Sequence, residues 1–174
     1  IPSKTMSLPT QIDPRKLALQ GITLEGEFFA KHLPRLSASV VAVNSSLSAT
    51  LEFTRDQSRQ PLVKGEAKIS VDVICQRCLD PMSIEIKAAI ALQVIWSEDR
   101  IANVSPDYEP WIVVDKIADL AVVLEDELLL ALPIVNYHNL GECTGNAVVS
   151  KATTNDDEEA VADSPFSVLK QLKH

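Results

Sequence analysis

The clearest pattern in the chain is an alternation of apolar and polar residues, which is typical of half-buried β-strands. It runs through residues 63–73 and, after a turn at Asp80-Pro81, resumes through residues 82–94. Two long strands joined by a short turn predict an antiparallel hairpin, with Cys75-Gln-Arg-Cys78 at its tip. Residues 47–54 alternate in the same way. We therefore expect an antiparallel β-sheet, open or barrel-like, with this long hairpin at its centre.

A helical pattern follows the sheet segments. Leu120, Leu124 and Leu128 recur at a spacing of four and form one stripe of an amphipathic helix. Asp119 can cap this helix and Pro133 ends it, so we expect the main helix of the fold here. The acidic residues 125–127 are consecutive, so their side chains point in different directions around the helix. They predict a solvated helix face, with a protein contact as the second interpretation, rather than a pair of catalytic carboxylates.

Start and stop signals also predict short helices near both ends of the chain. Asp13 can cap a helix over residues 14–20, and Gly21 suits its left-handed exit. Residues 144–163 are acidic and lack aromatic side chains, which predicts a flexible linker. Residues 164–174 predict a C-terminal helix that docks on another surface, because so short a helix is marginal in water. The fold class is thus α+β, with a single domain over residues 1–143.

Charge is spread unevenly along the chain. The formal net charge is −8, yet residues 1–64 hold eight Lys/Arg and five Asp/Glu, a net of +3. An acidic chain is a poor non-specific nucleic-acid binder, because contacts with phosphate supply most of that affinity. A basic patch in the first third can still bind RNA, and the acidic remainder can hold a basic protein. Charge alone favours neither, and a role in solubility is the simplest interpretation.

The three cysteines are an odd number, which a secreted disulfide framework would not favour, so we expect a cytoplasmic protein with reduced thiols. Cys75 and Cys78 form a C-x-x-C pair of the kind that supplies two ligands to zinc, and His138 and Cys143 can supply two more. Against this stands the simpler interpretation that the thiols bind nothing, since a lone C-x-x-C with irregular partners often arises by chance. The sequence favours no cofactor and leaves zinc as the alternative.

Between the cysteines lie Gln76 and Arg77. A guanidinium at a hairpin tip should be exposed and suits phosphate or carboxylate, so we expect these two residues to contact RNA or another partner. The simpler interpretation is two polar residues in a turn. No helix follows Cys78, which disfavours a thioredoxin-type redox pair. The sequence has no glycine-rich phosphate loop, G-x-S-x-G or H-E-x-x-H motif, and we expect no enzyme.

Four motifs occur in one order along the chain: C-Q-R-C-x-x-P at 75–81, Y-E-P at 108–110, V-L-E-D-E-L-L-L-A-L-P at 123–133 and P-F-S-V-L-K-Q-L-K at 165–173. In the order and the residues of these motifs, the chain resembles the YceD proteins, also called the DUF177 family. The resemblance runs from Asp13 to Lys173, apart from the acidic linker. Many relatives carry several further cysteines after the A-L-P helix, in what looks like a zinc cluster. This chain keeps only Cys143 there, a departure that weighs against metal.

The resemblance implies a non-enzymatic ribosome biogenesis factor that supports the synthesis, processing or stability of large-subunit (23S-type) rRNA. Its partner would be that rRNA or its precursor particle, held by the basic first third of the chain and Arg77. The alternative is an acidic adaptor that binds a ribosomal protein or assembly factor without direct RNA contact. Neither interpretation involves a membrane.

Overall fold

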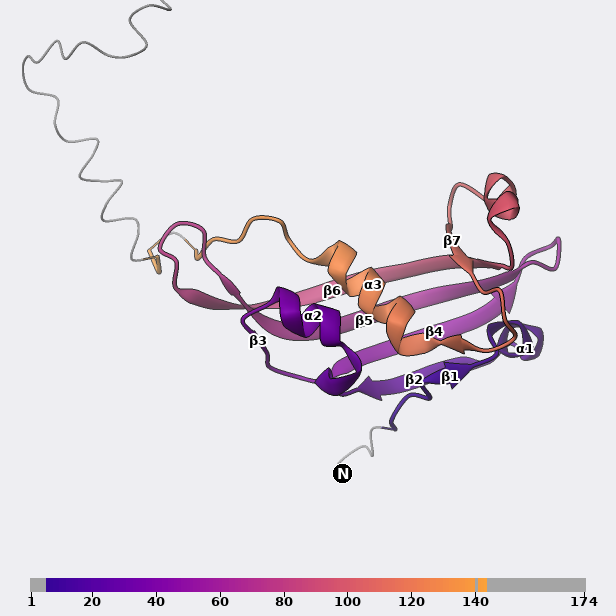
Figure 1. The fold of residues 1–174 in the computed structure, drawn as a ribbon, viewed down its shortest axis with the longest axis horizontal. Coiled ribbons are helices and arrows are strands. Elements are labelled where there is room, and N and C mark those ends of the chain that lie inside the picture. Colours follow the sequence, from indigo (N-terminus) through magenta and orange to yellow (C-terminus); the bar gives the residue numbers. More distant parts are fainter. Residues whose placement is uncertain (1–5, 140, 144–174) are drawn as a thin grey trace, which may run out of the picture.

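A computed structural model describes residues 6–139 and 141–143 of the 174-residue chain. The predicted linker (144–163) and C-terminal helix (164–174) lie outside these residues, and they stay predictions. Three α-helices, two short 3-10 helices and eight strands are described (Figure 1). In chain order they are β1 (Gln11–Ile12), α1 (Pro14–Gln20), β2 (Thr23–Phe28), η1 (Ala30–His32), α2 (Pro34–Ser39), β3 (Ala42–Val43), β4 (Leu47–Arg55), β5 (Pro61–Ile74), β6 (Pro81–Ile95), η2 (Glu98–Asn103), β7 (Glu109–Ile112), β8 (Ala118–Asp119) and α3 (Leu120–Ala131).

The main sheet has the strand order β2-β4-β5-β6-β7, with the short β3 also paired to β5. All of its pairs are antiparallel except β6–β7, which is parallel. The expected α+β class with a mostly antiparallel sheet is therefore confirmed. The sheet is open, because its path ends at β2 on one side and β7 on the other. The barrel-like alternative is wrong, since closure would require these two edge strands to pair.

Strands β5 and β6 form one long hairpin at the centre of the sheet. Their pairing extends from Leu62 opposite Gln93 to Ile74 opposite Pro81. On its other side β5 pairs with β4, and Gly65 allows the two backbones to approach closely. A Cβ at this position would lie 2.0 Å from the Thr50 carbonyl oxygen, so any larger residue would push β4 away.

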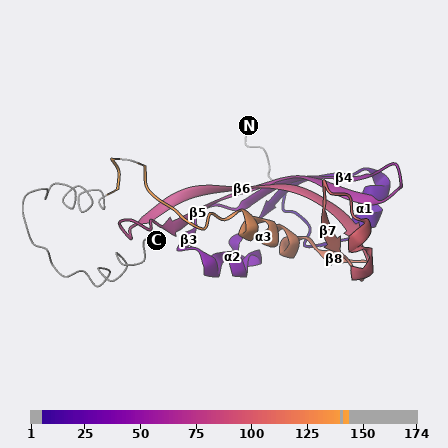
Figure 2. The same cartoon turned by 90° about the horizontal axis from the view of Figure 1, so that it is seen from above.

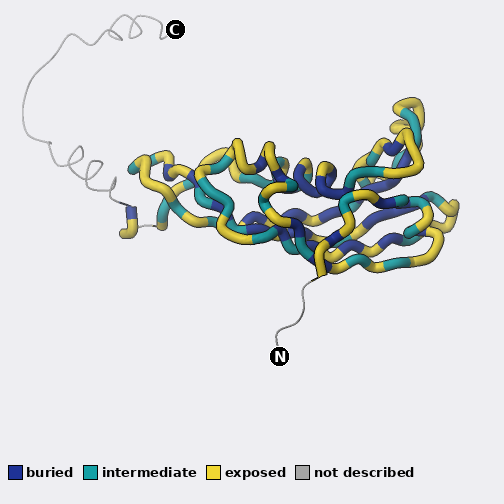
Figure 3. Tube along the Cα trace, turned by 60° about the horizontal axis from the view of Figure 1, so that its bottom comes forward, coloured by how far each residue is buried: buried dark blue, intermediate teal, exposed yellow. Residues whose placement is uncertain are grey.

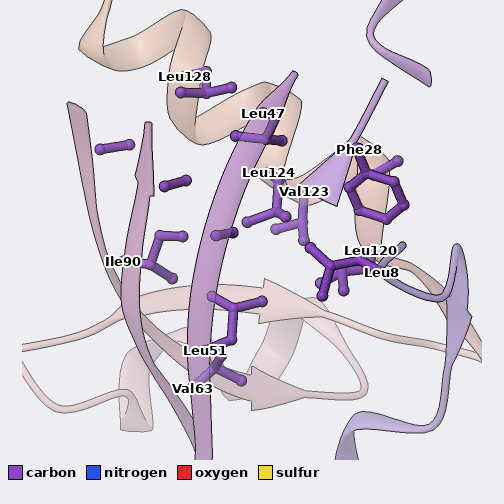
Figure 4. Close-up of a cluster of buried hydrophobic side chains, with 14 of the residues drawn as sticks. Leu8, Phe28, Leu47, Leu51, Val63, Ile90, Leu120, Val123, Leu124 and Leu128 are labelled. Carbon is purple, nitrogen blue, oxygen red and sulfur yellow. The ribbon is translucent and has the colours of Figure 1, made fainter. Parts of the chain in front are cut away.

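The helices α2 and α3 lie on the same face of the curved sheet (Figure 2). Buried and more exposed residues alternate along the strands, as a sheet covered on one face requires (Figure 3). The core lies between this covered face and α3 (Figure 4). It includes Phe28, Leu47, Leu51, Val63, Ile90, Leu120, Leu124 and Leu128.

Side-chain and glycine signals set the helix ends. Asp119 begins α3, since its carboxylate accepts hydrogen bonds from two backbone N–H groups in the first turn, at 2.9 and 3.3 Å. The helix ends at Ala131, two residues before Pro133. Asp13 caps α1 by accepting from the Lys16 N–H at 3.0 Å, and Gly21 closes it with a φ of 63°. None of the described helices is long and apolar enough to cross a membrane.

The solvated face expected for residues 125–127 is wrong for Glu125, which is only 2% exposed. Its Oε1 accepts hydrogen bonds from the backbone N–H groups of Arg35 and Leu36, at 2.7 and 3.0 Å. These are unpaired donors of the first turn of α2, whose own N-cap residue, Leu33, has no side-chain oxygen to offer. Glu125 also pairs with the Arg35 guanidinium at 2.9 Å. An acidic residue of α3 thus caps α2 and ties the two helices together.

Candidate metal-binding site

The tip of the β5–β6 hairpin is a tight turn over residues 75–80. The Cys75 N–H donates to the Asp80 carbonyl and the Leu79 N–H donates to the Cys75 carbonyl, both at 2.9 Å. Leu79 closes the turn in the left-handed region, with a φ of 65°. These bonds bring the side chains of Cys75 and Cys78 to the same end of the hairpin, where Cys75 is buried and Cys78 is half-buried.

A second segment, residues 134–139 and 141–143, also reaches this tip and is called here the returning segment. After α3 the chain runs back along the sheet to the end of the hairpin (Figure 1). Gln76 holds it there through two hydrogen bonds, from its backbone N–H to the Asn136 carbonyl at 2.9 Å and from its side-chain amide to the Ile134 carbonyl at 3.1 Å. The segment thereby places His138 and Cys143 beside the two cysteines of the turn.

Four potential metal ligands therefore meet at the hairpin tip: Cys75, Cys78, His138 and Cys143, called here the cysteine–histidine group. Their ligand atoms all lie within 4.8 Å of one another. The two buried sulfur atoms, of Cys75 and Cys143, are 3.8 Å apart. The Cys78 sulfur is 3.3 Å from the His138 Nδ1. All three cysteines are free thiols, so no disulfide accounts for the cluster.

This spacing can be compared with that of a tetrahedral zinc site. Zinc–sulfur bonds of about 2.3 Å and zinc–nitrogen bonds of about 2.0–2.1 Å give ligand-to-ligand distances of about 3.5–3.8 Å. The Cys75–Cys143 and Cys78–His138 distances lie at or just below this range, and every other pair of ligand atoms lies within 4.8 Å. The residues present therefore fit a four-coordinate metal ion of the zinc type, and only small side-chain movements would be needed to bind one.

The environment of Cys75 favours the thiolate that a metal requires. Burial opposes ionisation of the thiol and would raise its pKa. Hydrogen bonds to its sulfur outweigh this effect and lower the pKa of Cys75 from 9.0 to about 5, chiefly from the backbone N–H groups of Cys78, His138 and Arg77. These donors come both from the hairpin turn and from the segment after α3.

Comparison with known proteins assigns the chain to a family. A family model described as "Large ribosomal RNA subunit accumulation protein YceD" matches residues 63–173. A curated protein of that name from Haemophilus influenzae is 32% identical over 170 residues, covering 97% of each chain. The chain belongs to the YceD family. No solved structure matches it.

Two residues of the motif at 75–81, Cys75 and Cys78, thus belong to the cysteine–histidine group. Of the other predicted contact residues, Gln76 is exposed but already holds the segment after α3. Arg77 is half-buried rather than fully exposed, and its guanidinium carbon lies 5.0 Å from the centroid of the Tyr137 ring. Stacking of this kind orients the guanidinium, and it links the tip to the same returning segment.

Sequence reasoning identified all four potential ligands of this YceD-family chain but missed the contacts that bring them together. The carbonyl groups of Ile134 and Asn136 and the ring of Tyr137 lie 58–60 positions after their partners. Backbone carbonyls leave no residue-type signal in a sequence. Among these three contacts, only the Tyr137 side chain, one residue before His138, has a residue type that could have indicated a contact with the tip.

Proposed function

We propose that this protein is a non-enzymatic ribosome biogenesis factor that supports accumulation of large-subunit rRNA and contacts that RNA or its precursor particle. The observation that carries the proposal is membership of the YceD family across nearly the whole chain. The similar Haemophilus influenzae protein is named for accumulation of the large ribosomal RNA subunit. At 32% identity over 97% of both chains, the same overall role is the simplest inference.

The cysteine–histidine group has a structural part in this proposal. Zinc held by Cys75, Cys78, His138 and Cys143 would have four protein ligands and no open position for water, which is the arrangement of a structural site. Bound there, it would supply a cross-link between the turn at the tip and the segment that follows α3. The two segments would then present Gln76, Arg77 and Tyr137 as one rigid surface, where we expect Gln76 and Arg77 to contact the partner.

Deleting the gene is expected to lower the amount of 23S-type rRNA relative to 16S-type rRNA and to reduce free large subunits in a sucrose gradient. Expression of the intact chain should restore both. The measurement is quantitative hybridisation of the two rRNAs at equal growth rate, since growth rate alone changes ribosome content. Unchanged rRNA and subunit ratios in the deleted strain would refute the proposed role.

A second function, a protein-binding adaptor without RNA contact, is favoured by one observation. Apolar side chains beside the tip are exposed, with Ile134 at 92% and Leu79 at 72%. Affinity purification with and without nuclease separates the two functions. Partners that persist after nuclease, with no RNA recovered, support the adaptor, and loss of the partners after nuclease supports the RNA-associated factor.

A further inference from the structure

A second cluster of functional side chains lies at the other end of the β5–β6 hairpin, far from the cysteine–histidine group. The hairpin strand β5 has 14 residues, which corresponds to about 46 Å at roughly 3.3 Å per residue. At its far end, α1, the β4–β5 turn and the segment around η2 come together (Figures 1 and 2). Each of them brings arginine to this end: Arg15, Arg55, Arg59 and Arg100.

Three of these arginines border an open cleft with a tryptophan in its wall. The cleft has a volume of about 520 Å³ and is lined by Arg15, Arg55, Arg59, Gln60 and Trp96. Trp96 is half-buried, and two guanidinium groups lie against its ring. The Arg15 and Arg100 carbons are 5.1 and 4.2 Å from the ring centroid. We call these side chains, with Arg100, the arginine cleft.

The arginine cleft gathers four positive side chains that have no close acidic partner in the part of the chain that the structure describes. Within residues 6–139 and 141–143, the four guanidinium groups form no ion pair, whereas Arg35 binds both Glu125 and Asp126. The nearest acidic residue of the turn, Asp56, accepts a hydrogen bond from the Gln60 N–H at 2.7 Å instead. A concentration of arginine without close ion pairs among the described residues is unexpected on a chain with a net charge of −8, and it favours an anionic ligand.

Arg15 is fixed in place yet has an unused donor. Its Nη2 donates to the Val113 carbonyl at 2.8 Å, which holds the side chain between α1 and the segment after β7. Its Nε is buried and makes no hydrogen bond to any residue that the structure describes. A buried donor without an acceptor costs about 1–3 kcal/mol in typical proteins, and a small movement of this side chain would let a ligand oxygen supply the acceptor.

Arg59 occupies a backbone position that usually selects glycine. It is the fourth of the five residues between β4 and β5, and its φ is 63°. The loop is closed by the Arg59 N–H, which donates to the Asp56 carbonyl at 3.0 Å. Glycine would adopt this left-handed conformation with less strain. The presence of arginine indicates that the side chain serves a purpose beyond forming the turn.

We propose that the arginine cleft binds a short single-stranded RNA segment, with the guanidinium groups on phosphates and the Trp96–arginine stack against a base. Guanidinium groups suit phosphate oxygens, and an aromatic ring with stacked arginine suits an unpaired base, so the combination favours RNA over an acidic protein. The inference rests on the proposed rRNA function and adds a contact site that is distinct from the hairpin tip. Because the rest of the chain is acidic, only a few phosphates are engaged.

Binding of a fluorescently labelled single-stranded RNA of about 12 nucleotides tests this directly, by anisotropy from about 50 to 200 mM salt. Three to four phosphate contacts predict that log affinity falls with log salt at a slope of about −2 to −3. Arg59→Gly should weaken binding by about fivefold or more and make the slope less steep by about 0.7. It should not lower thermal stability, because glycine fits the turn. Trp96→Leu should also weaken binding by about fivefold or more.

Lys31→Ala is the matched control, because it removes one exposed positive charge outside the cleft and should leave RNA affinity nearly unchanged. Equal binding by Arg59→Gly and the unmodified chain, or equal losses in Arg59→Gly and Lys31→Ala, would overturn the site. Tighter binding of an acidic phosphopeptide than of RNA would also overturn it. These outcomes leave the rRNA function standing, whereas normal rRNA levels in the deleted strain would refute that function and leave RNA binding by the cleft intact.

Discussion

Replacing Glu125 with alanine should lower the free energy of unfolding by about 2–5 kcal/mol. The substitution leaves the backbone N–H groups of Arg35 and Leu36 without an acceptor in a largely buried position, and each such donor costs about 1–3 kcal/mol. It also removes the only side-chain cap of α2 within the described residues. Urea unfolding followed by circular dichroism measures the change.

Asp126→Ala is the matched control, since Asp126 is adjacent in sequence and pairs with the same Arg35 side chain at 2.6 Å. Both partners of that pair are half exposed, so its loss should cost less than about 1 kcal/mol. Glu125→Gln should fall between the two variants. One oxygen, Oε1, accepts both backbone hydrogen bonds and is kept in glutamine, while the ion pair with Arg35 is lost. Equal costs for Glu125→Ala and Asp126→Ala would contradict the capping role.

Cys75→Ser should abolish metal binding by the cysteine–histidine group. Protein purified without added metal or chelator should carry about one zinc per chain, and the variant should carry almost none, because a thiolate ligand is lost from a four-ligand site. Elemental analysis of the purified proteins gives the ratio. Glu142→Gln is the control, since Glu142 lies in the same segment but offers no ligand to the group, and it should retain zinc.

Loss of the metal should release the returning segment while the sheet stays folded. Cys75 and Cys143 are buried but do not belong to the hydrophobic core cluster. The Gln76 N–H, which donates to the Asn136 carbonyl, should therefore exchange with solvent at least about tenfold faster in Cys75→Ser, a loss of about 1.4 kcal/mol of local stability. Core amides of β5 should be unaffected. Substoichiometric zinc in the unmodified chain, or global unfolding of the variant, would contradict this structural role.

The strands were the part of the fold most open to prediction from sequence. A sheet covered on one face imposes a period of two, and Val63, Ala67, Ile69, Val71 and Val73 are all buried on that face. The ends of α1 could be predicted equally well, because Asp13 and Gly21 act through local hydrogen bonds and backbone conformation. Closure of the sheet could not be predicted in this way, because it depends on strand curvature and on what pairs with the edge strands.

Interactions between distant segments were much harder to predict. The helix pattern predicts a solvated Glu125, because it shows which residues are polar but not that the start of another helix, about 90 positions earlier, needs its oxygen. The four potential ligands could be predicted because the chain has only three cysteines and three histidines, so few combinations can form a metal site. The basic first third of the chain was the only sequence feature that indicated the arginine cleft. The contribution of Arg100 could not be predicted, because it depends on tertiary packing around Trp96.

Ultraviolet cross-linking in growing cells, followed by sequencing of the RNA bound to the chain, tests direct contact with large-subunit rRNA. The account predicts strong enrichment of large-subunit rRNA over small-subunit rRNA and messenger RNA, with less RNA recovered from cells that express Arg59→Gly. RNA recovery equal to that of cells not exposed to light would contradict it.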